Sequence, residues 1–205
     1  MPLSLRSAEP ADADAVIETL SQAFLTDPVS RWVIPDHTVL LDVNRRVFRL
    51  YVDLALEAGE IRVSEALAAA AIWFEVPADA PEPEEAGAGA ADEPGDDFTA
   101  EVAVACAPFG DRLRVLDRVA RGIHPGHERH QYLPFVGVAP RAQGTGLGTA
   151  LVKDRMDTVG GPLYLEASAP RNHALYARLG FADLGPPVSL PDGPRLWPMW
   201  WDGKP

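Results

Sequence analysis

The sequence is poor in three features that would point to particular classes of protein. It has one cysteine, Cys106, among 205 residues, and a single thiol forms neither an internal disulfide nor a cysteine-rich metal cluster. Its longest apolar runs, such as residues 66–74, are much shorter than the ~20 residues of a membrane-spanning helix. Residues 1–16 lack the basic segment and long apolar run of a secretory signal. We therefore expect a cytoplasmic protein without a membrane span.

Positive charge is also scarce. The chain has 18 Lys and Arg residues against 30 Asp and Glu residues, a formal net charge of -12. No basic field offsets the repulsion from phosphates, so we expect neither nucleic acid nor an anionic membrane as a partner. A cationic small molecule would be attracted, and the same acidity also serves solubility.

Hydrophobic periodicity predicts a mixed α/β fold in one domain spanning residues 1–205. A chain of this length buries about 70% of its unfolded surface, enough for one substantial core. Apolar residues at helical spacing and runs typical of strands alternate along the chain. The predicted helices are 12–24, 39–58 and 98–121, the last with a break at 108–110, and the predicted strands are 3–6, 60–63, 67–76 and 132–138.

Residues 78–97 interrupt this alternation. The segment contains acids, Gly, Ala and Pro but no Lys, Arg or aromatic residue. Such a composition does not bury enough apolar surface to pack. We expect a mobile acidic loop, with an acidic lid over a cationic substrate as the alternative.

A glycine-rich turn between strand 132–138 and a following helix is the most informative segment. Its glycines, at 144, 146 and 148, let a ligand approach the backbone, and a helix N-terminus offers unpaired N–H groups to an anion. The turn therefore predicts a phosphate site. A nucleoside-triphosphatase loop is excluded because no Gly-Lys-Ser/Thr follows. A dinucleotide-binding fold would use an acidic residue about 20 residues after the turn, where Glu166 lies, to bind the ribose. The glycine spacing i, i+2, i+4 disfavours it, because that fold has i, i+2, i+5. A purely structural turn is the other alternative.

The segment 138–148, Val-Ala-Pro-Arg-Ala-Gln-Gly-Thr-Gly-Leu-Gly, resembles the acyl-CoA signature of the GNAT N-acetyltransferase superfamily. Segments 164–172 and 176–181 resemble the strand, helix and closing motif that follow it there. Within the superfamily the sequence is similar to the puromycin N-acetyltransferase group, although 78–97 looks like an insertion. The resemblance implies a GNAT fold: a twisted, mostly antiparallel mixed sheet, flanked by helices and splayed at the acyl-CoA-binding strand. It also implies transfer of an acetyl group from acetyl-CoA to the primary amine of a small molecule in a ternary complex.

The resemblance also implies where acetyl-CoA binds. The turn would hold its pyrophosphate, and backbone N–H groups of strand 133–138 would hold the pantetheine and stabilise the developing oxyanion. The residues expected to contact the cofactor are Phe135, Val136, Gly137, Val138, Arg141, Gln143, Gly144, Thr145, Gly146, Leu147, Gly148, Thr149, Asn172 and Tyr176.

Two residues are candidates for proton transfer. Tyr176 follows Asn172 by four residues, so both side chains face the same side of a helix. A phenol of pKa about 10 is a suitable acid for a thiolate whose conjugate acid has a pKa of about 8.5. Glu166, at the end of a strand, is the candidate base, although an α-amino group of pKa about 7.7–8.0 is partly neutral without one. The alternatives are a core tyrosine, a paired carboxylate and, for Asn172, a helix N-cap.

An acceptor pocket and a histidine cluster complete the predictions. Asp27 and Glu75 are candidates to select a cationic amine, and each predicted pocket residue is equally compatible with core packing. His124, His127 and His130 have an i, i+3, i+6 spacing, but Pro and Gly between them break a helix, so we expect an exposed turn and no metal site. The predicted aromatic wall consists of Phe24, Trp32, Tyr51 and Trp73.

The sequence leaves the acceptor and the assembly open. Specificity for small amines depends on pocket residues and loops, so puromycin itself is not established as a substrate. A protein or peptide N-acetyltransferase and a non-catalytic acyl-CoA-binding sensor are the alternative functions. The chain is expected to be a monomer or a homodimer.

Overall fold

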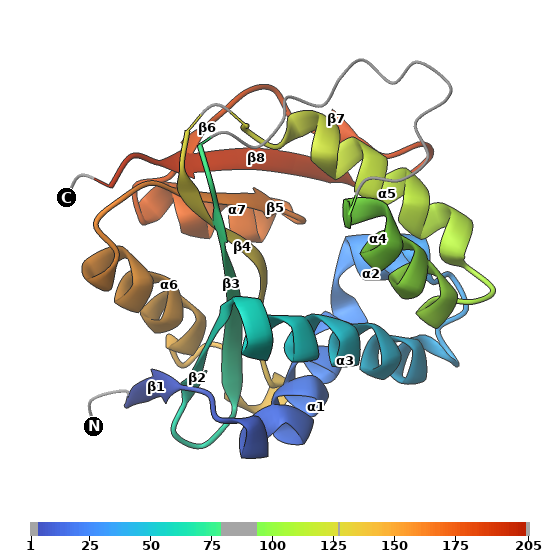
Figure 1. Cartoon of the computed structure of the whole chain (residues 1–205), viewed down its shortest axis with the longest axis horizontal. Helices are drawn as coiled ribbons and strands as arrows, with labels where there is room; N and C mark the ends of the chain where they lie inside the picture. The colour runs from blue at the N-terminus through green and yellow to red at the C-terminus, as the bar shows by residue number, and fades with distance from the viewer. Residues whose placement is uncertain (1–3, 79–93, 127, 204–205) are drawn as a thin grey trace.

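The computed structural model describes residues 4–78, 94–126 and 128–203 (Figure 1). Strands and helices alternate as the periodicity predicts. The helices are α1 Ala13–Ala23, α2 Pro28–Val33, α3 Leu40–Ala58, α4 Pro94–Ala105, α5 Gly110–Ile123, α6 Leu147–Thr158 and α7 Pro170–Arg178. The strands are β1 Leu5–Ser7, β2 Glu60–Ser64, β3 Ala69–Val76, β4 His130–Val138, β5 Leu163–Ala167, β6 Ala182–Asp183, β7 Val188–Ser189 and β8 Arg195–Trp201.

The described strands form one mostly antiparallel sheet in the order β1-β2-β3-β4-β5-β8-β6, with β7 paired to β8. Strands β2 and β3 form the antiparallel pair expected from the sequence. The pair β4–β5 is parallel, because the crossover through α6 returns the chain to the end of the sheet at which β4 begins. The sheet is therefore mixed, as predicted.

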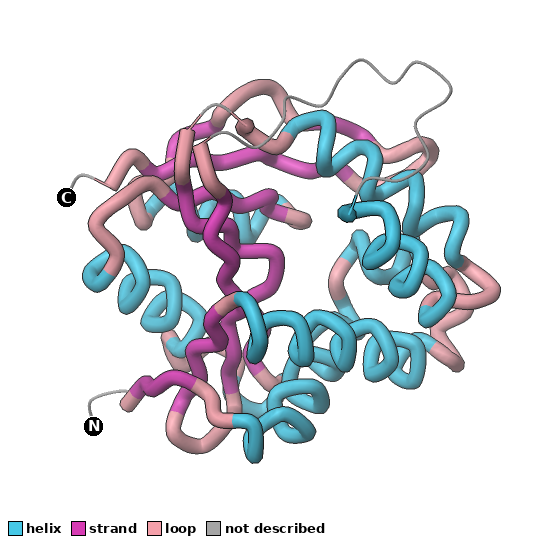
Figure 2. Tube along the Cα trace, viewed as in Figure 1, coloured by secondary structure: helices cyan, strands magenta, loops and turns pink. Residues whose placement is uncertain are grey.

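Helices cover both faces of this sheet, α6 and α7 on one side and α1 and α3 on the other (Figure 2). Successive side chains of β3 alternate between the two cores: Ala71 and Trp73 pack on the α6 side, and Ala70 and Ile72 pack on the α1 side. A third apolar cluster joins α2, α3 and α5. Members of all three clusters, among them Leu133, Phe48 and Val29, line one cavity.

The helical break predicted at 108–110 is present, because α4 ends at Ala105 and α5 starts at Gly110. Any Cβ at Gly110 would lie 2.5 Å from the carbonyl oxygen of Ala103, so only glycine permits the two helices to approach this closely. The loop predicted for 78–97 is wrong at its end, since residues 94–97 form the first turn of α4. Pro94 favours a helix start because its missing N–H would have no intrahelical acceptor there. Residues 79–93 lie outside the described residues.

The sheet opens between β4 and β5. The two strands pair at Gln131 with Leu163 and at Tyr132 with Tyr164, and then diverge. At the same point the register of β4 against β3 shifts, so that one β3 residue, Trp73, faces both Leu133 and Pro134. Proline has no N–H for a ladder and is tolerated at such a bulge. Beyond Tyr132 no described strand pairs with this edge of β4, which is the splay predicted from the sequence.

Candidate active site

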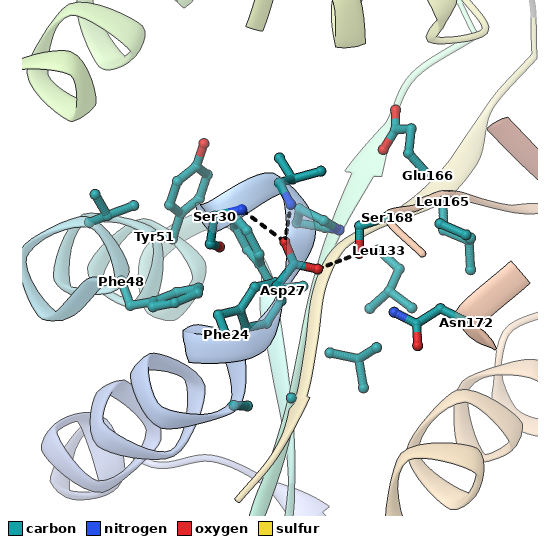
Figure 3. A pocket seen from close by; sticks show the side chains of 18 of the residues that line it. Phe24, Asp27, Ser30, Phe48, Tyr51, Leu133, Leu165, Glu166, Ser168 and Asn172 are labelled. Atoms are coloured by element: carbon teal, nitrogen blue, oxygen red, sulfur yellow. Dashed lines mark hydrogen bonds between the residues drawn. The ribbon is translucent and has the colours of Figure 1, made fainter. Parts of the chain in front are cut away.

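A cavity of about 1080 Å³ fills the gap where β4 and β5 separate. Its walls come from β4 and β5, from the glycine turn and α7, and from α1 to α5. In Figure 3, Phe24, Phe48 and Tyr51 lie on one side of it and Glu166 and Asn172 on the other. The cavity thus connects the glycine turn, where an anion would bind, to an aromatic chamber.

The glycine turn has the geometry of an anion site. Gly144 and Gly146 have φ values of 78° and 88°, the left-handed region that glycine adopts without strain. Open space surrounds both, because a Cβ at either position would have no atom within 4 Å. Gly146 is the N-cap of α6, so the first N–H groups of that helix have no intrahelical acceptor. These residues fit the pyrophosphate of a nucleotide-type cofactor.

Most of the residues predicted to contact the cofactor line the cavity. Arg141 and Thr145 do not, although they belong to the same turn, where the Thr145 hydroxyl donates to the Ala142 carbonyl at 2.6 Å. Gly137 lines the cavity but also has a structural reason to be glycine, since a Cβ would lie 2.9 Å from atoms of α1. The lining members of the predicted set are Phe135, Val136, Gly137, Val138, Gln143, Gly144, Gly146, Leu147, Gly148, Thr149, Asn172 and Tyr176.

Asn172 and Tyr176 both project from α7 into this cavity. The N-cap of α7 is Ala169, so the N-cap alternative for Asn172 is wrong. Tyr176 is buried and packs against Phe181, with ring centroids 5.9 Å apart. Burial, and then the charge of Asp27, raise the pKa of Tyr176. The phenol therefore carries its proton throughout the physiological range, and it is a weaker acid than the unperturbed phenol assumed from the sequence.

Glu166 offers a buried acceptor at the opposite wall. Its side chain is 8% exposed, and its Oε1 is buried without a hydrogen-bond partner among the described residues. The nearest imidazole nitrogen, Nδ1 of His124, is 3.8 Å away. Burial, and then the Glu166 charge, raise the pKa of Tyr132 and of Tyr164, and a hydrogen bond of each hydroxyl with the Glu166 carboxylate adds to the effect. A buried polar atom without a partner is rare in folded proteins, which makes Glu166 a candidate functional residue.

Asp27 lines the cavity, but its carboxylate already has partners. It is the N-cap of α2, and its Oδ1 accepts the N–H groups of Val29 and Ser30, both at 2.9 Å. Its other oxygen accepts the hydroxyl of Ser168, just after β5 (Figure 3). The carboxylate thus links α2 to the end of β5, and its predicted role as a selector of cationic amines stays a prediction.

Two substitutions of Asp27 separate these roles. Asp27→Ala removes the cap, and we expect it to lower the free energy of unfolding by about 1–2 kcal/mol. Asp27→Asn keeps an acceptor for the cap and is expected to unfold close to wild type, with KM for an amine changed less than about threefold. Urea unfolding and steady-state kinetics measure these effects. A large rise in KM for Asp27→Asn would instead support the predicted role of Asp27 in selecting the amine.

Trp73 and Glu75 lie away from the cavity. Odd-numbered residues of β3 point to the α6 face, so Trp73 is fully buried there while Phe74 lines the cavity. Glu75 is half exposed and pairs with Arg129. Side chains at every second position of a strand lie on the same face, so Trp73 and Glu75 share the face opposite Phe74. The sequence did not indicate which face of β3 borders the cavity.

Trp32 also lies outside the cavity. Its indole nitrogen donates to the carbonyl of Pro191 at 3.1 Å. The guanidinium of Arg112 lies over its ring, 5.5 Å from the centroid. Trp32 therefore joins α2 to α5 and to the turn before β8. Of the predicted aromatic wall, Phe24 and Tyr51 line the cavity.

The sequence analysis missed several lining residues. Phe48, Phe74 and Phe98 complete the aromatic wall, and Tyr51 makes edge contacts with the rings of Phe98 and Phe135 at 5.1 and 4.7 Å. A polar group, Thr99, Asp117 and Arg121, lies between α4 and α5, where Arg121 donates to Asp117 at 2.9 Å. Cys106 also lines the cavity, and burial raises the pKa of its thiol to about 11, which keeps it unreactive.

The histidines are not the exposed turn that the sequence predicts. His130 is 2% exposed, and its Nε2 lies 3.0 Å from Nε2 of His124, which lines the cavity. The buried strand β4 carries His130 into the core, whereas its neighbour His127 lies outside the described residues. No group of three His, Cys, Asp or Glu residues suited to a metal ion is found in the described ranges. Across the same ranges, no helix is long and apolar enough to cross a membrane.

Comparison with known proteins agrees with this architecture. Residues 84–181, just under half of the chain, match the Acetyltransferase (GNAT) family. The fold is shared with the histone acetyltransferase HPA2 and related acetyltransferase from Corynebacterium glutamicum, at 26% identity and a TM-score of 0.66 over 98% of this chain and 96% of that chain. A mosquito arylalkylamine N-acetyltransferase like 5b has 16% identity and a TM-score of 0.68 over 98% and 99%. Arylalkylamine N-acetyltransferase 2 from Aedes aegypti has 14% identity and a TM-score of 0.62 over all of both chains. The predicted GNAT fold is thereby confirmed.

Proposed function

We propose that this protein is an acetyl-CoA-dependent N-acetyltransferase of the GNAT family that acetylates the primary amine of a small molecule. The observation that carries the proposal is a single cavity that joins an anion-binding glycine turn to Tyr176 and Glu166. The family match over residues 84–181 and the shared fold support it. When bound, acetyl-CoA supplies an acetyl group activated as a thioester.

The residues of the chain divide into those that hold the cofactor and those that move protons. The turn around Gly144 and Gly146 holds the pyrophosphate through backbone N–H groups. The edge of β4 beyond Tyr132, which has no partner strand on the β5 side, offers its N–H groups to the pantetheine and to the thioester oxygen. Asn172, one helical turn before Tyr176, contacts the pantetheine.

Tyr176 is the proposed acid and Glu166 the proposed base. Tyr176 remains protonated because burial raises its pKa, so it has a proton to give to the departing thiolate. Glu166 has a buried carboxylate oxygen without a donor, which accepts a proton from the amine. Both side chains are buried, which strengthens their interaction with charge.

The shape of the acceptor chamber favours a small amine with an aromatic or apolar part. Its wall combines aromatic side chains from α3, α4 and β4 around Tyr51, and such walls bind ring systems by edge contacts. Puromycin-like amines and arylalkylamines meet this description. A peptide acceptor is the second candidate, since the Corynebacterium relative is named a histone acetyltransferase.

The test measures thiol release from acetyl-CoA by the purified full chain with a panel of amines. The panel contains puromycin, an arylalkylamine, an aminoglycoside, a polyamine and short peptides, and Tyr176→Phe is run alongside. We expect turnover with a ring-bearing small amine. Turnover with peptides alone would replace the small-molecule proposal by the peptide one. Calorimetric CoA binding without turnover of any amine would favour the acyl-CoA sensor.

A further inference from the structure

We propose that His124 and His130 form a proton relay behind Glu166: His124 receives the proton that Glu166 removes from the amine, and His130 fixes the ring of His124. The inference rests on the proposed function for the identity of the proton donor. The placement of the protons follows from the geometry alone and is testable without any substrate.

The three side chains form a continuous line from the cavity into the core. Oε1 of Glu166 lies 3.8 Å from Nδ1 of His124, and Nε2 of His124 lies 3.0 Å from Nε2 of His130. Nδ1 of His130 lies 2.7 Å from the carbonyl oxygen of Glu128. The cavity end is a carboxylate and the core end is a backbone carbonyl, and both only accept hydrogen bonds when the carboxylate is ionised.

These contacts fix the tautomers. The Glu128 carbonyl is an acceptor, so Nδ1 of His130 carries a hydrogen. Nε2 of a neutral His130 is then an acceptor, and Nε2 of His124 carries the hydrogen between the rings. Nδ1 of a neutral His124 is left with a lone pair that faces the Glu166 carboxylate. Two acceptors face each other, and neither makes a hydrogen bond to the other.

When Glu166 is ionised and both rings are neutral, there is therefore no hydrogen between Glu166 and His124, and the line lacks one proton. Oε1 of Glu166 is accordingly buried without a hydrogen-bond partner among the described residues, while Tyr132 and Tyr164 interact with the same carboxylate. One added proton, on Nδ1 of His124 or on Glu166, turns these two acceptors into a donor and an acceptor. The line is completed when their 3.8 Å separation shortens to hydrogen-bond distance. The amine in the cavity is the source of that proton.

The surroundings direct the added proton to His124. His130 is buried, and desolvation lowers its pKa, so it stays neutral. Tyr132 from β4 and Tyr164 from β5 pack edge-on against the His124 ring, both at 4.7 Å between centroids, and both remain protonated since burial raises their pKa values. His124 is the C-cap of α5, where the helix dipole stabilises a positive charge.

The charged groups nearby do not compete for this role. The guanidinium of Arg121, on the preceding turn of α5, is held by Asp117 and by Thr99. The charge of the Glu128 carboxylate favours the charged form of His130, but burial opposes that form more strongly. Glu166 is thus the carboxylate that faces His124.

The protons balance over one round of the reaction. A protonated amine loses one proton to Glu166, which passes it to Nδ1 of His124; the ring becomes an imidazolium facing the carboxylate. As the N–C bond forms and the C–S bond breaks, Tyr176 gives its proton to the thiolate sulfur. The second proton of the nitrogen then restores Tyr176, and His124, which is about one-fifth exposed at 22%, releases its proton to solvent.

The first test observes ring nitrogens by NMR in full-length protein with ¹⁵N-labelled histidine and no cofactor. We expect the Nε2–H tautomer for His124 and the Nδ1–H tautomer for His130 at high pH, with His124 taking up a second proton on acidification. Glu166→Gln is expected to move that event to lower pH because the facing negative charge is lost. An Nδ1–H tautomer for His124, or no response to Glu166→Gln, would overturn the relay.

The second test compares His124→Gln and His130→Gln with wild type over a range of pH, using an amine found in the panel. We expect kcat/KM at neutral pH to fall about tenfold or more for His124→Gln and less for His130→Gln. The loss should fade above the pKa of the amine, about 7.7–8.0 for an α-amino group, because a neutral amine needs no base. A loss independent of pH would indicate a structural role.

A matched control is available in His173→Gln. His173 lies on α7, outside the cavity lining, with its Nε2 2.7 Å from Asp183, and this variant should keep the wild-type pH profile. If no amine in the panel is acetylated by wild type, the proposed function fails while the NMR test still decides the placement of the protons.

Discussion

Replacing Tyr176 with phenylalanine is expected to lower kcat about 100-fold, the usual effect of removing a general acid. The ring continues to pack against Phe181, so the fold and the acetyl-CoA Kd should change little. The phenol proton is lost, and water does not replace it easily in a buried position. Steady-state kinetics with a saturating amine measure kcat, and calorimetry measures the Kd.

The matched control for this prediction is Tyr51→Phe. Tyr51 is partly buried, its pKa is also raised by burial, and it lines the same cavity from α3. Its removal should change kcat by less than about threefold and act mainly on KM. An equal loss of kcat in Tyr176→Phe and Tyr51→Phe would mean that removing any hydroxyl from the cavity lowers activity. Tyr176 would then not be assigned as the acid.

Replacing Gly146 with alanine is expected to weaken acetyl-CoA binding about tenfold or more and to destabilise the fold. A residue with a Cβ at a φ of 88° costs about 1–2 kcal/mol in the left-handed region. The turn is open around Gly146, so the strain comes from the backbone and not from a neighbouring atom. Relaxing that strain turns the N–H groups of α6 away from the anion. Calorimetry and urea unfolding measure the two effects.

Gly122→Ala serves as the control for the glycine substitution. Gly122 is exposed inside α5, with no atom within 4 Å of a Cβ built there. Alanine in a helix interior is more stable than glycine by about 0.5–1 kcal/mol, so this variant should gain stability and keep the wild-type Kd. An unchanged Kd for Gly146→Ala would show that the turn does not hold the cofactor.

Features set by neighbouring residues were predictable from the sequence. The glycine turn was one of them, because positive φ at Gly144 and Gly146 and the start of α6 at Leu147 depend on a few adjacent positions. The helices, the β2–β3 pair and the break before Gly110 were predictable for the same reason, since the period of apolar residues is a local property. The common face of Asn172 and Tyr176 followed from their spacing on α7.

The composition of segment 78–97 was a weaker guide. It indicates low packing capacity but does not locate a helix start, and α4 begins inside the segment at Pro94. Where an element begins depends on what its later residues pack against, here Val102 and Ala103 in the core.

The sequence by itself thus determined the type and order of most elements from β1 to α7 and the position of the glycine turn, but not α2 or the three strands after α7. Only the tertiary structure decided which side chains share the cavity. Trp73 lies outside the cavity because its side of β3 packs against α6. Asp27 binds Ser168 because α2 lies next to the end of β5. His124 lies between Glu166 and His130 because α5 packs on β4 and β5. The physical reason is distance along the chain: these contacts join residues on separate elements, and local spacing carries no information about which elements meet.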